Sequence, residues 1–227
     1  MPNFIVREVT ENDGGRLLEG YRLLQQALGA ENVESFDCFR STVSPATDSC
    51  AVPRMVCALD QNEVIGFSVG AYLRNLNMGI IVYSGVKPGW RRRGVYTAVR
   101  GELIDLFNQS SDEARREGLA SERRIAYVVS EQEEGSELFN RYVTEWGAHV
   151  APCDYEQPEA HGLTVRPLKL VVQPVGRNRP PTANEVIELV RELYERLYRI
   201  ADVDHNPSYL RVVASVQKVQ KSEAVRA

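Results

Sequence analysis

The segment 86–98 constrains the fold more than any other part of the chain. It follows an apolar, strand-like run at residues 80–83. After the segment begins, apolar residues recur at the spacing of a helix, at Val95, Val99, Leu103 and Leu106. The turn between strand and helix is rich in arginine and glycine, with Arg91, Arg92, Arg93 and Gly94 in succession. The sequence therefore predicts a strand, a tight basic turn and a helix.

A turn of this kind is suited to bind an anion. The first backbone N–H groups of a helix lack partners within the helix, and the macrodipole adds partial positive charge there. Gly94 has no Cβ to keep a phosphate from those amides, and the arginines add fixed charge and forked donors. Arginine runs also occur on solvated surfaces, and glycine with proline is common in turns. The strand before and the helix after favour the anion site.

The turn resembles the acyl-CoA pyrophosphate loop of the GNAT N-acyltransferase superfamily. The pattern of that loop is Arg/Gln-x-x-Gly-x-Gly/Ala after a strand ending in Val-x-Pro. Arg91 and Gly94 match the loop, and Val86 with Pro88 match the strand end. Tyr96 departs from the pattern at its last position, where a small residue is usual. The segment is not a Walker A loop, because no Gly-Lys-Ser/Thr follows, and it lacks the spaced glycines of a dinucleotide fingerprint.

The order of elements along the chain also resembles that family. We expect strands at 4–9, 55–59, 64–73, 78–86, 124–130, 149–152 and 163–173, and helices within 10–41 and at 94–109 and 136–146, with a polar connection at 110–123. The resemblance covers about residues 4–174. It implies an α/β (α+β) fold with a mixed, mostly antiparallel central sheet flanked by helices.

A C-terminal extension follows the expected GNAT-like acyltransferase domain of residues 1–175. Within residues 176–227, the sequence Thr182-Ala183-Asn184-Glu185 has the signature of a capping box and predicts a helix at about 183–200. The apolar stripe of this helix packs on its own domain or on a second copy, so a homodimer through it is one of two outcomes. Residues 215–227 have little apolar pattern, and we expect a flexible tail there.

Composition excludes several classes of partner. The 43% apolar and 26% charged shares fit a globular chain, and no apolar run approaches the roughly 20 residues that span a bilayer. With no signal-peptide pattern at the N-terminus, we expect a cytoplasmic protein with no membrane partner. The net charge of −4 argues against a nucleic-acid partner.

The four cysteines form no CxxC pair, so we expect free or buried thiols and no metal; they are Cys38, Cys50, Cys57 and Cys153.

The resemblance implies a co-substrate and the residues that hold it. Acetyl-CoA, or another acyl-CoA, would lie with its pantetheine arm along the backbone of the strand end, at Ser84, Gly85 and Val86. Its pyrophosphate would lie on the turn formed by Arg91, Arg92, Arg93, Gly94, Val95 and Tyr96. Asn140, on the helix at 136–146, is a further candidate contact to the cofactor.

Acyl transfer also needs a proton donor for the thiolate and a proton acceptor for the amine. The family places a tyrosine acid four residues before a Gly-Phe pair. Here the pair is Gly147-Ala148, and Tyr142 is one position off that register, so the alternative is a tyrosine packed in the core. Glu131, just past the expected strand at 124–130, is the best-placed base, although a water chain could replace it.

Two functions remain open at this point. The first is an N-acyltransferase, most simply an acetyltransferase, that moves an acyl group directly from acyl-CoA to a small-molecule or peptide amine. The second is a GNAT-like module that binds acyl-CoA without catalysis, as a sensor or partner-binding protein. The first is the leading hypothesis, and Tyr96, the register of Tyr142 and the lack of a carboxylate between Val64 and Val86 are points toward the second.

Overall fold

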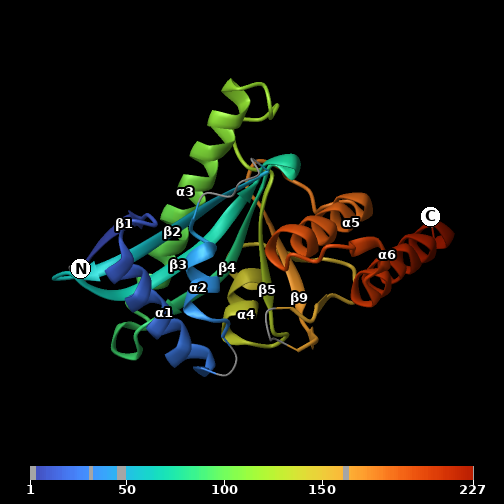
Figure 1. Ribbon diagram of the computed structural model, residues 1–227. Coiled ribbons are helices and arrows are strands. Elements are labelled where there is room, and N and C mark those ends of the chain that lie inside the picture. Colours follow the sequence, from blue (N-terminus) through green and yellow to red (C-terminus); the bar gives the residue numbers. More distant parts are fainter. Residues whose placement is uncertain (1–3, 31–32, 45–49, 161–163, 227) are drawn as a thin grey trace. The chain divides into compact units, whose positions relative to one another are not determined.

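The computed structural model describes residues 4–30, 33–44, 50–160 and 164–226 (Figure 1). The chain forms two compact units, Met1–Ile125 and Ala126–Ala227. The expected boundary between a catalytic domain and an extension at residue 175 stays a prediction.

The first unit contains a four-stranded antiparallel sheet in the order β1-β2-β3-β4. Its strands are β1 (Ile5–Val9), β2 (Ala51–Asp60), β3 (Glu63–Leu73) and β4 (Met78–Val86). A 3₁₀ turn, η2 (Arg74–Leu76), joins the last two. β2 begins earlier than the predicted strand at 55–59, because its first residues continue to pair with β3, from Ala51 opposite Leu73 onward.

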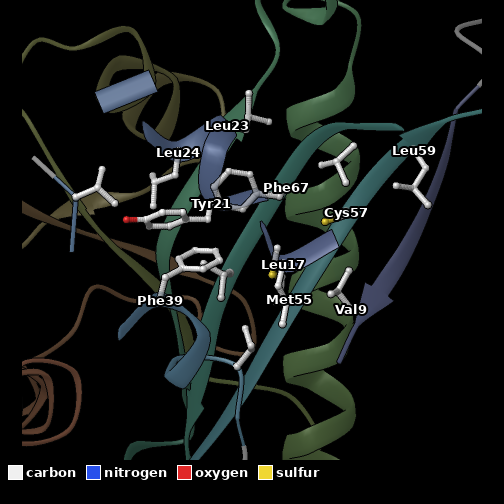
Figure 2. Packing of buried hydrophobic residues seen from close by; sticks show 14 residues of the cluster. Val9, Leu17, Tyr21, Leu23, Leu24, Phe39, Met55, Cys57, Leu59 and Phe67 are labelled. Atoms are coloured by element: carbon white, nitrogen blue, oxygen red, sulfur yellow. The ribbon is translucent and has the colours of Figure 1, made fainter. Parts of the chain in front are cut away.

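Helices pack on both faces of this sheet. They are α1 (Gly14–Leu28), α2 (Phe36–Ser41) and α3 (Val95–Arg116). In Figure 2, Tyr21 of α1, Phe39 of α2 and Phe67 of β3 lie in one buried cluster with residues of the sheet. On β3, Phe67 points into this cluster while its neighbour Gly66 faces Val95 of α3. Because successive strand residues face opposite sides, α1 and α3 cover opposite faces of the sheet.

Helix α3 is longer than the sequence predicted. The segment after residue 109 was expected to be a polar connection, but the helix continues to Arg116. Two serines in this part of the helix are buried and bonded to residues distant in the chain. Arg54 Nη2 donates to the Ser110 hydroxyl at 3.0 Å, and the Ser111 hydroxyl donates to Asn77 Oδ1 at 2.7 Å. The connection begins only at Glu117.

The second unit contains a three-stranded antiparallel sheet in the order β5-β9-β6 and a separate two-stranded pair. The three strands are β5 (Tyr127–Gln132), β9 (Lys169–Pro174) and β6 (His149–Val150), and the pair is β7 (Glu156–Gln157) with β8 (Arg166–Pro167). β5 lies later than the predicted strand at 124–130. Glu131 therefore lies within the strand, opposite Leu170, rather than past its end. The predicted strand at 163–173 is divided between β8 and β9, and residue 163 lies outside the described residues.

The helices of the second unit are α4 (Glu137–Thr144), α5 (Ala183–Glu192), the π-helical turn η4 (Leu193–Leu197), the 3₁₀ turn η5 (Val203–His205) and α6 (Pro207–Arg226). The capping box is confirmed: Glu185 N–H donates to the Thr182 hydroxyl at 3.3 Å, and Thr182 N–H donates to the Glu185 carboxylate at 2.7 Å. The apolar stripe of α5 is buried within its own unit, where α5 packs on α6 (Figure 1). A homodimer therefore gains no support from this stripe.

The expected flexible tail is instead helical. Helix α6 extends through residues 215–226, which the sequence predicted to lack structure. Tyr209, Val212 and Val216 recur at helical spacing and are buried. This buried stripe begins at Tyr209, before the segment that was expected to be a tail, so the mostly polar residues 217–222 continue a helix whose earlier turns are already packed.

Two small residues let α3 approach the sheet closely. A Cβ on Gly79 would lie 2.2 Å from Cδ2 of the Phe107 ring, and a Cβ on Gly66 would lie 2.5 Å from Cγ1 of Val95. Contacts this short are not compatible with a side chain. Phe107 and Val95 are both fully buried, so the absence of side chains on the strands is what admits them.

Gly79→Ala should lower the free energy of unfolding by about 1–3 kcal/mol, because the added methyl overlaps the ring of Phe107. Urea denaturation monitored by circular dichroism measures this change. Gly101→Ala is the matched control, because a Cβ there meets nothing within 4 Å and the residue lies inside α3. That control should raise stability by about 0.5–1 kcal/mol. Equal effects of the two substitutions would contradict the packing argument.

Candidate functional site

The end of β4 is packed tightly against β3. The Ser84 hydroxyl lies 2.8 Å from the Ser68 hydroxyl, and a Cβ on Gly85 would lie 2.7 Å from Cε1 of Phe67. Val86, the last residue of the strand, pairs with Gly66. The backbone of these three predicted cofactor residues is thus held by its pairing with β3.

The basic turn is built from one 3₁₀ turn and two left-handed residues. The strand runs into η3 (Pro88–Trp90), and Arg92 and Gly94 then have φ values of 60° and 82°. Gly94 is the N-cap residue of α3, where it has no side chain to cap the helix. Left-handed conformations are readily adopted by glycine and strained for arginine. The turn thereby reverses the chain within a few residues and starts the helix directly.

Positive charge is exposed at this turn. Arg91, Arg92 and Arg93 are all exposed, and no carboxylate among the described residues pairs with them. The Arg93 guanidinium lies 5.3 Å above the ring of Trp90, which orients it. The first turn of α3 contains no acidic residue. Three exposed guanidinium groups beside a helix start make this the part of the first unit best suited to bind an anion.

The two residues after Gly94 differ in their surroundings. Val95 is buried against Gly66, so it fixes the start of α3 and offers a ligand only its backbone. Tyr96 is half-buried and is not without an interaction partner. The large residue at this position of the loop is therefore accommodated by the fold.

In the second unit, the predicted base lies between two phenols. The Tyr198 hydroxyl lies 2.8 and 2.7 Å from the two carboxylate oxygens of Glu131, and the Tyr155 hydroxyl also donates to Oε1 of that carboxylate. Burial raises the pKa of Glu131, and the hydrogen bonds from Tyr155 and Tyr198 oppose that rise. A carboxylate with a raised pKa is better matched to accept a proton near neutral pH.

The predicted acid and the further cofactor candidate lie on α4. Tyr142 is fully buried in a cluster with Ala148 and Val171, with its ring edge-on to Trp146 at 4.9 Å between centroids. Asn140 is exposed, and its side-chain amide donates to the Gly135 carbonyl at 3.3 Å. The register of Tyr142 therefore directs its ring into the core of the second unit.

The predicted site residues divide between the two units. The strand end and the basic turn belong to the first unit, and Glu131, Asn140 and Tyr142 belong to the second. Sequence reasoning missed Tyr155 and Tyr198, which the structure brings to Glu131. No spacing in the sequence links residues so far apart, so no sequence pattern pointed to these two tyrosines.

No group of three or more His, Cys, Asp or Glu residues in the described part of the chain could hold a metal ion. No described helix has both the length and the apolar character needed to cross a membrane. Cys57 and Cys153 are free and buried, and burial raises the pKa of each thiol to about 12.

No protein-family description matches the sequence, and no curated protein matches it. Solved structures do match its fold. A protein from Bacteroides thetaiotaomicron assigned to the GNAT family of acetyltransferases has 15% identity and a TM-score of 0.62, over 86% of this chain and 99% of that one.

Two further structures match most of the chain. The ribosomal-protein-S18-alanine N-acetyltransferase of Escherichia coli has 14% identity and a TM-score of 0.53, over 78% of this chain and 96% of that one. A diaminobutyrate acetyltransferase from Paenibacillus lautus was solved with L-2,4-diaminobutyric acid and coenzyme A. It has 15% identity and a TM-score of 0.53, over 79% of this chain and 99% of that one. At these identities the likeness establishes the fold. The chain has the α/β fold of the GNAT superfamily, with a mostly antiparallel sheet and flanking helices.

Gly94→Ala should lower the free energy of unfolding by about 1–2 kcal/mol, because alanine is strained at a φ of 82°. Thermal denaturation followed by circular dichroism tests this expectation. Gly89→Ala is the matched control in the same turn, since a Cβ there meets nothing within 4 Å and its φ is not positive. If both variants have wild-type stability, the left-handed conformation of Gly94 is not required by the turn.

Proposed function

We propose that this chain is an acyl-CoA-dependent N-acyltransferase, with acetyl-CoA as its simplest donor. The observation that carries the proposal is the exposed basic turn that links β4 to α3 in a fold whose solved examples include N-acetyltransferases. The pyrophosphate of acyl-CoA carries negative charge, and the Arg91–Arg93 guanidinium groups and the backbone amides at the start of α3 offer it matching donors.

The strand end supplies the second part of the binding site. Ser84, Gly85 and Val86 would bind the pantetheine arm through main-chain groups, as an added strand does. Main-chain recognition of this kind depends on a rigid strand, and the pairing of Val86 with Gly66 supports that rigidity. Asn140 would add a polar contact from α4.

Acyl-CoA supplies the acyl group as an activated thioester. The amine nitrogen of the acceptor forms a bond to the acyl carbon, and the bond between that carbon and the CoA sulfur breaks. Glu131 receives the proton that the amine loses, directly or through water, and Tyr142 gives its phenolic proton to the departing thiolate. The raised pKa of Glu131 suits the first role.

The proposed transfer is direct, without an acyl-enzyme on Cys57 or Cys153. The reactive form of a cysteine is its thiolate, and burial raises the pKa of both Cys57 and Cys153 to about 12. At neutral pH these two thiols are therefore protonated and poor nucleophiles.

The acceptor would be a small-molecule or peptide amine, since the solved neighbours include enzymes named for each kind. We place the protein in the cytoplasm, as an enzyme without a metal.

Replacing Arg91 and Arg93 together by alanine should weaken CoA binding by about 10–100-fold, because charged hydrogen bonds to the pyrophosphate are lost. Isothermal titration calorimetry with CoA measures this directly. Arg116→Ala with Arg123→Ala is the matched control, since these two arginines are 68% and 78% exposed in the same unit and lie at and beyond the other end of α3. Equal losses in the two double variants would indicate a general charge effect and contradict the assigned pyrophosphate site.

Tyr142→Phe should lower kcat by roughly 100-fold, the low end for loss of a general acid, while CoA affinity stays near that of the wild type. The assay follows thiol release from acetyl-CoA with a panel of amines. Tyr194→Phe removes another buried hydroxyl of the same unit, one that donates to the Glu156 carbonyl at 2.6 Å, and should leave kcat unchanged. Full turnover by Tyr142→Phe would assign the proton to water or another residue. No turnover of any amine by the wild type, with CoA still bound, would favour the acyl-CoA-binding module.

A further inference from the structure

The carboxylate of Glu131 is held by two segments that lie far from it in the sequence. Tyr155 lies just before β7, and Tyr198 directly follows the π-helical turn η4 of the C-terminal region. The Tyr198 hydroxyl shares its hydrogen between the two carboxylate oxygens at 2.8 and 2.7 Å. The Tyr155 hydroxyl donates to Oε1. A single carboxylate in β5 thus accepts from a loop and from the extension.

The π-helical turn has a part in this geometry. Helix α5 ends at Glu192, and the N–H of Tyr198 then donates to the carbonyl of Leu193 at 3.0 Å, a spacing of five residues. The extra residue in the turn rotates the next side chains about the helix axis, relative to their positions in a regular α-helix. Arg199 then takes a left-handed φ of 54°, which ends the helical run just after the phenol. Short π-helical turns are rare and are frequent at functional sites.

The rings around Glu131 form one aromatic cluster. Tyr194 lies edge-on to Tyr155 at 6.3 Å and to Tyr198 at 6.1 Å between ring centroids. Its own hydroxyl donates to the main-chain carbonyl of Glu156 at 2.6 Å. Tyr194 therefore supports both rings that reach Glu131, while its hydroxyl is committed to a different acceptor.

The charged groups near this cluster are paired with one another. Glu133 pairs with Arg166, and Glu134 pairs with Lys169 at 3.4 Å. The carboxylate of Glu156, next to Tyr155, pairs with Arg211. Within the described residues, Glu131 has no Arg, Lys or His partner. Its donors are neutral phenols, which stabilise the anion without neutralising its charge.

We propose that Tyr155 and Tyr198 are positioning residues that fix the orientation and the charge state of Glu131 as the proton acceptor of acyl transfer. The C-terminal extension then completes the site, because Tyr198 belongs to it. This inference rests on the proposed function, in which Glu131 takes the proton of the amine. Glu131 becomes a neutral carboxylic acid in that step, both phenols keep their own protons, and the acquired proton then passes to water.

Tyr198→Phe and Tyr155→Phe test the proposal, because each keeps its ring and removes one donor. Hydrogen bonds to a carboxylate favour its anion, so loss of a donor raises the pKa of Glu131. Carbon-13 NMR of the protein labelled at glutamate carboxyl carbons follows this titration, with Glu131→Gln to assign the resonance. We expect the midpoint of Glu131 to rise by about one pH unit in each variant. The acidic limb of the pH profile of kcat/KM should rise by the same amount.

Tyr194→Phe is the matched control, since it removes a hydroxyl from the same cluster that does not touch Glu131. The midpoint of Glu131 should not move in this variant. A merely structural role for Tyr155 and Tyr198 would lower stability without moving the acidic limb. An unmoved NMR midpoint in both variants would overturn the proposal. The proposal would also be overturned if the NMR midpoint of Glu131 moves while the acidic limb of the pH profile of kcat/KM stays in place. Glu131 would then not be the group whose charge controls the reaction.

The two proposals fail in different ways in this experiment. If the wild-type protein transfers no acyl group to any amine, the proposed function fails and the catalytic part of this inference falls with it. The NMR titration still decides whether the two phenols control the charge of Glu131.

Discussion

The close approach of α3 to its sheet is the constraint on which the rest of the first unit depends. Gly79 admits the ring of Phe107, and Gly66 admits Val95, at positions where a Cβ would overlap both side chains. Val95 is the first residue of the helix, so its burial against the strand also fixes where the helix begins. The basic turn has few residues in which to connect β4 to that point. The left-handed conformation of Gly94, with φ 82°, lies within this short connection.

The candidate residues of the two units, taken separately, have opposite electrostatic character. The turn gathers exposed guanidinium groups at a helix start, although the chain as a whole carries a net charge of −4. Such a surface suits a multiply charged ligand that arrives from water. Glu131 is half-buried beside the buried rings of Tyr155 and Tyr198, whose hydroxyls are neutral donors, and there a single proton changes the local charge. The first arrangement suits binding, and the second suits proton transfer.

The sequence predicted the features that depend on neighbouring residues. The strand, turn and helix around Gly94 and the capping box at Thr182 were predicted correctly, because each is set by spacing within a few residues. The length of α3 and the helical C-terminus were not, since Ser110, Ser111 and Ser215 bond to residues distant in the chain. The sequence did not predict the two tyrosine donors of Glu131 for the same reason. Its two donors lie 24 and 67 residues away.

The choice of a carboxylate at position 131 argues for chemistry rather than for stability alone. A side chain needed only to tie the extension to β5 could be a glutamine, whose carbonyl also accepts from a phenol. Burying a neutral amide costs less than burying a carboxylate without a cationic partner. Among the residues that the structure describes, the donors to Glu131 are neutral phenols, so the fold bears the larger cost of desolvation. Unlike an amide, the carboxylate can take up a proton. Burial raises its pKa, the hydrogen bonds from Tyr155 and Tyr198 limit that rise, and a carboxylate with such a pKa is suited to act as a base.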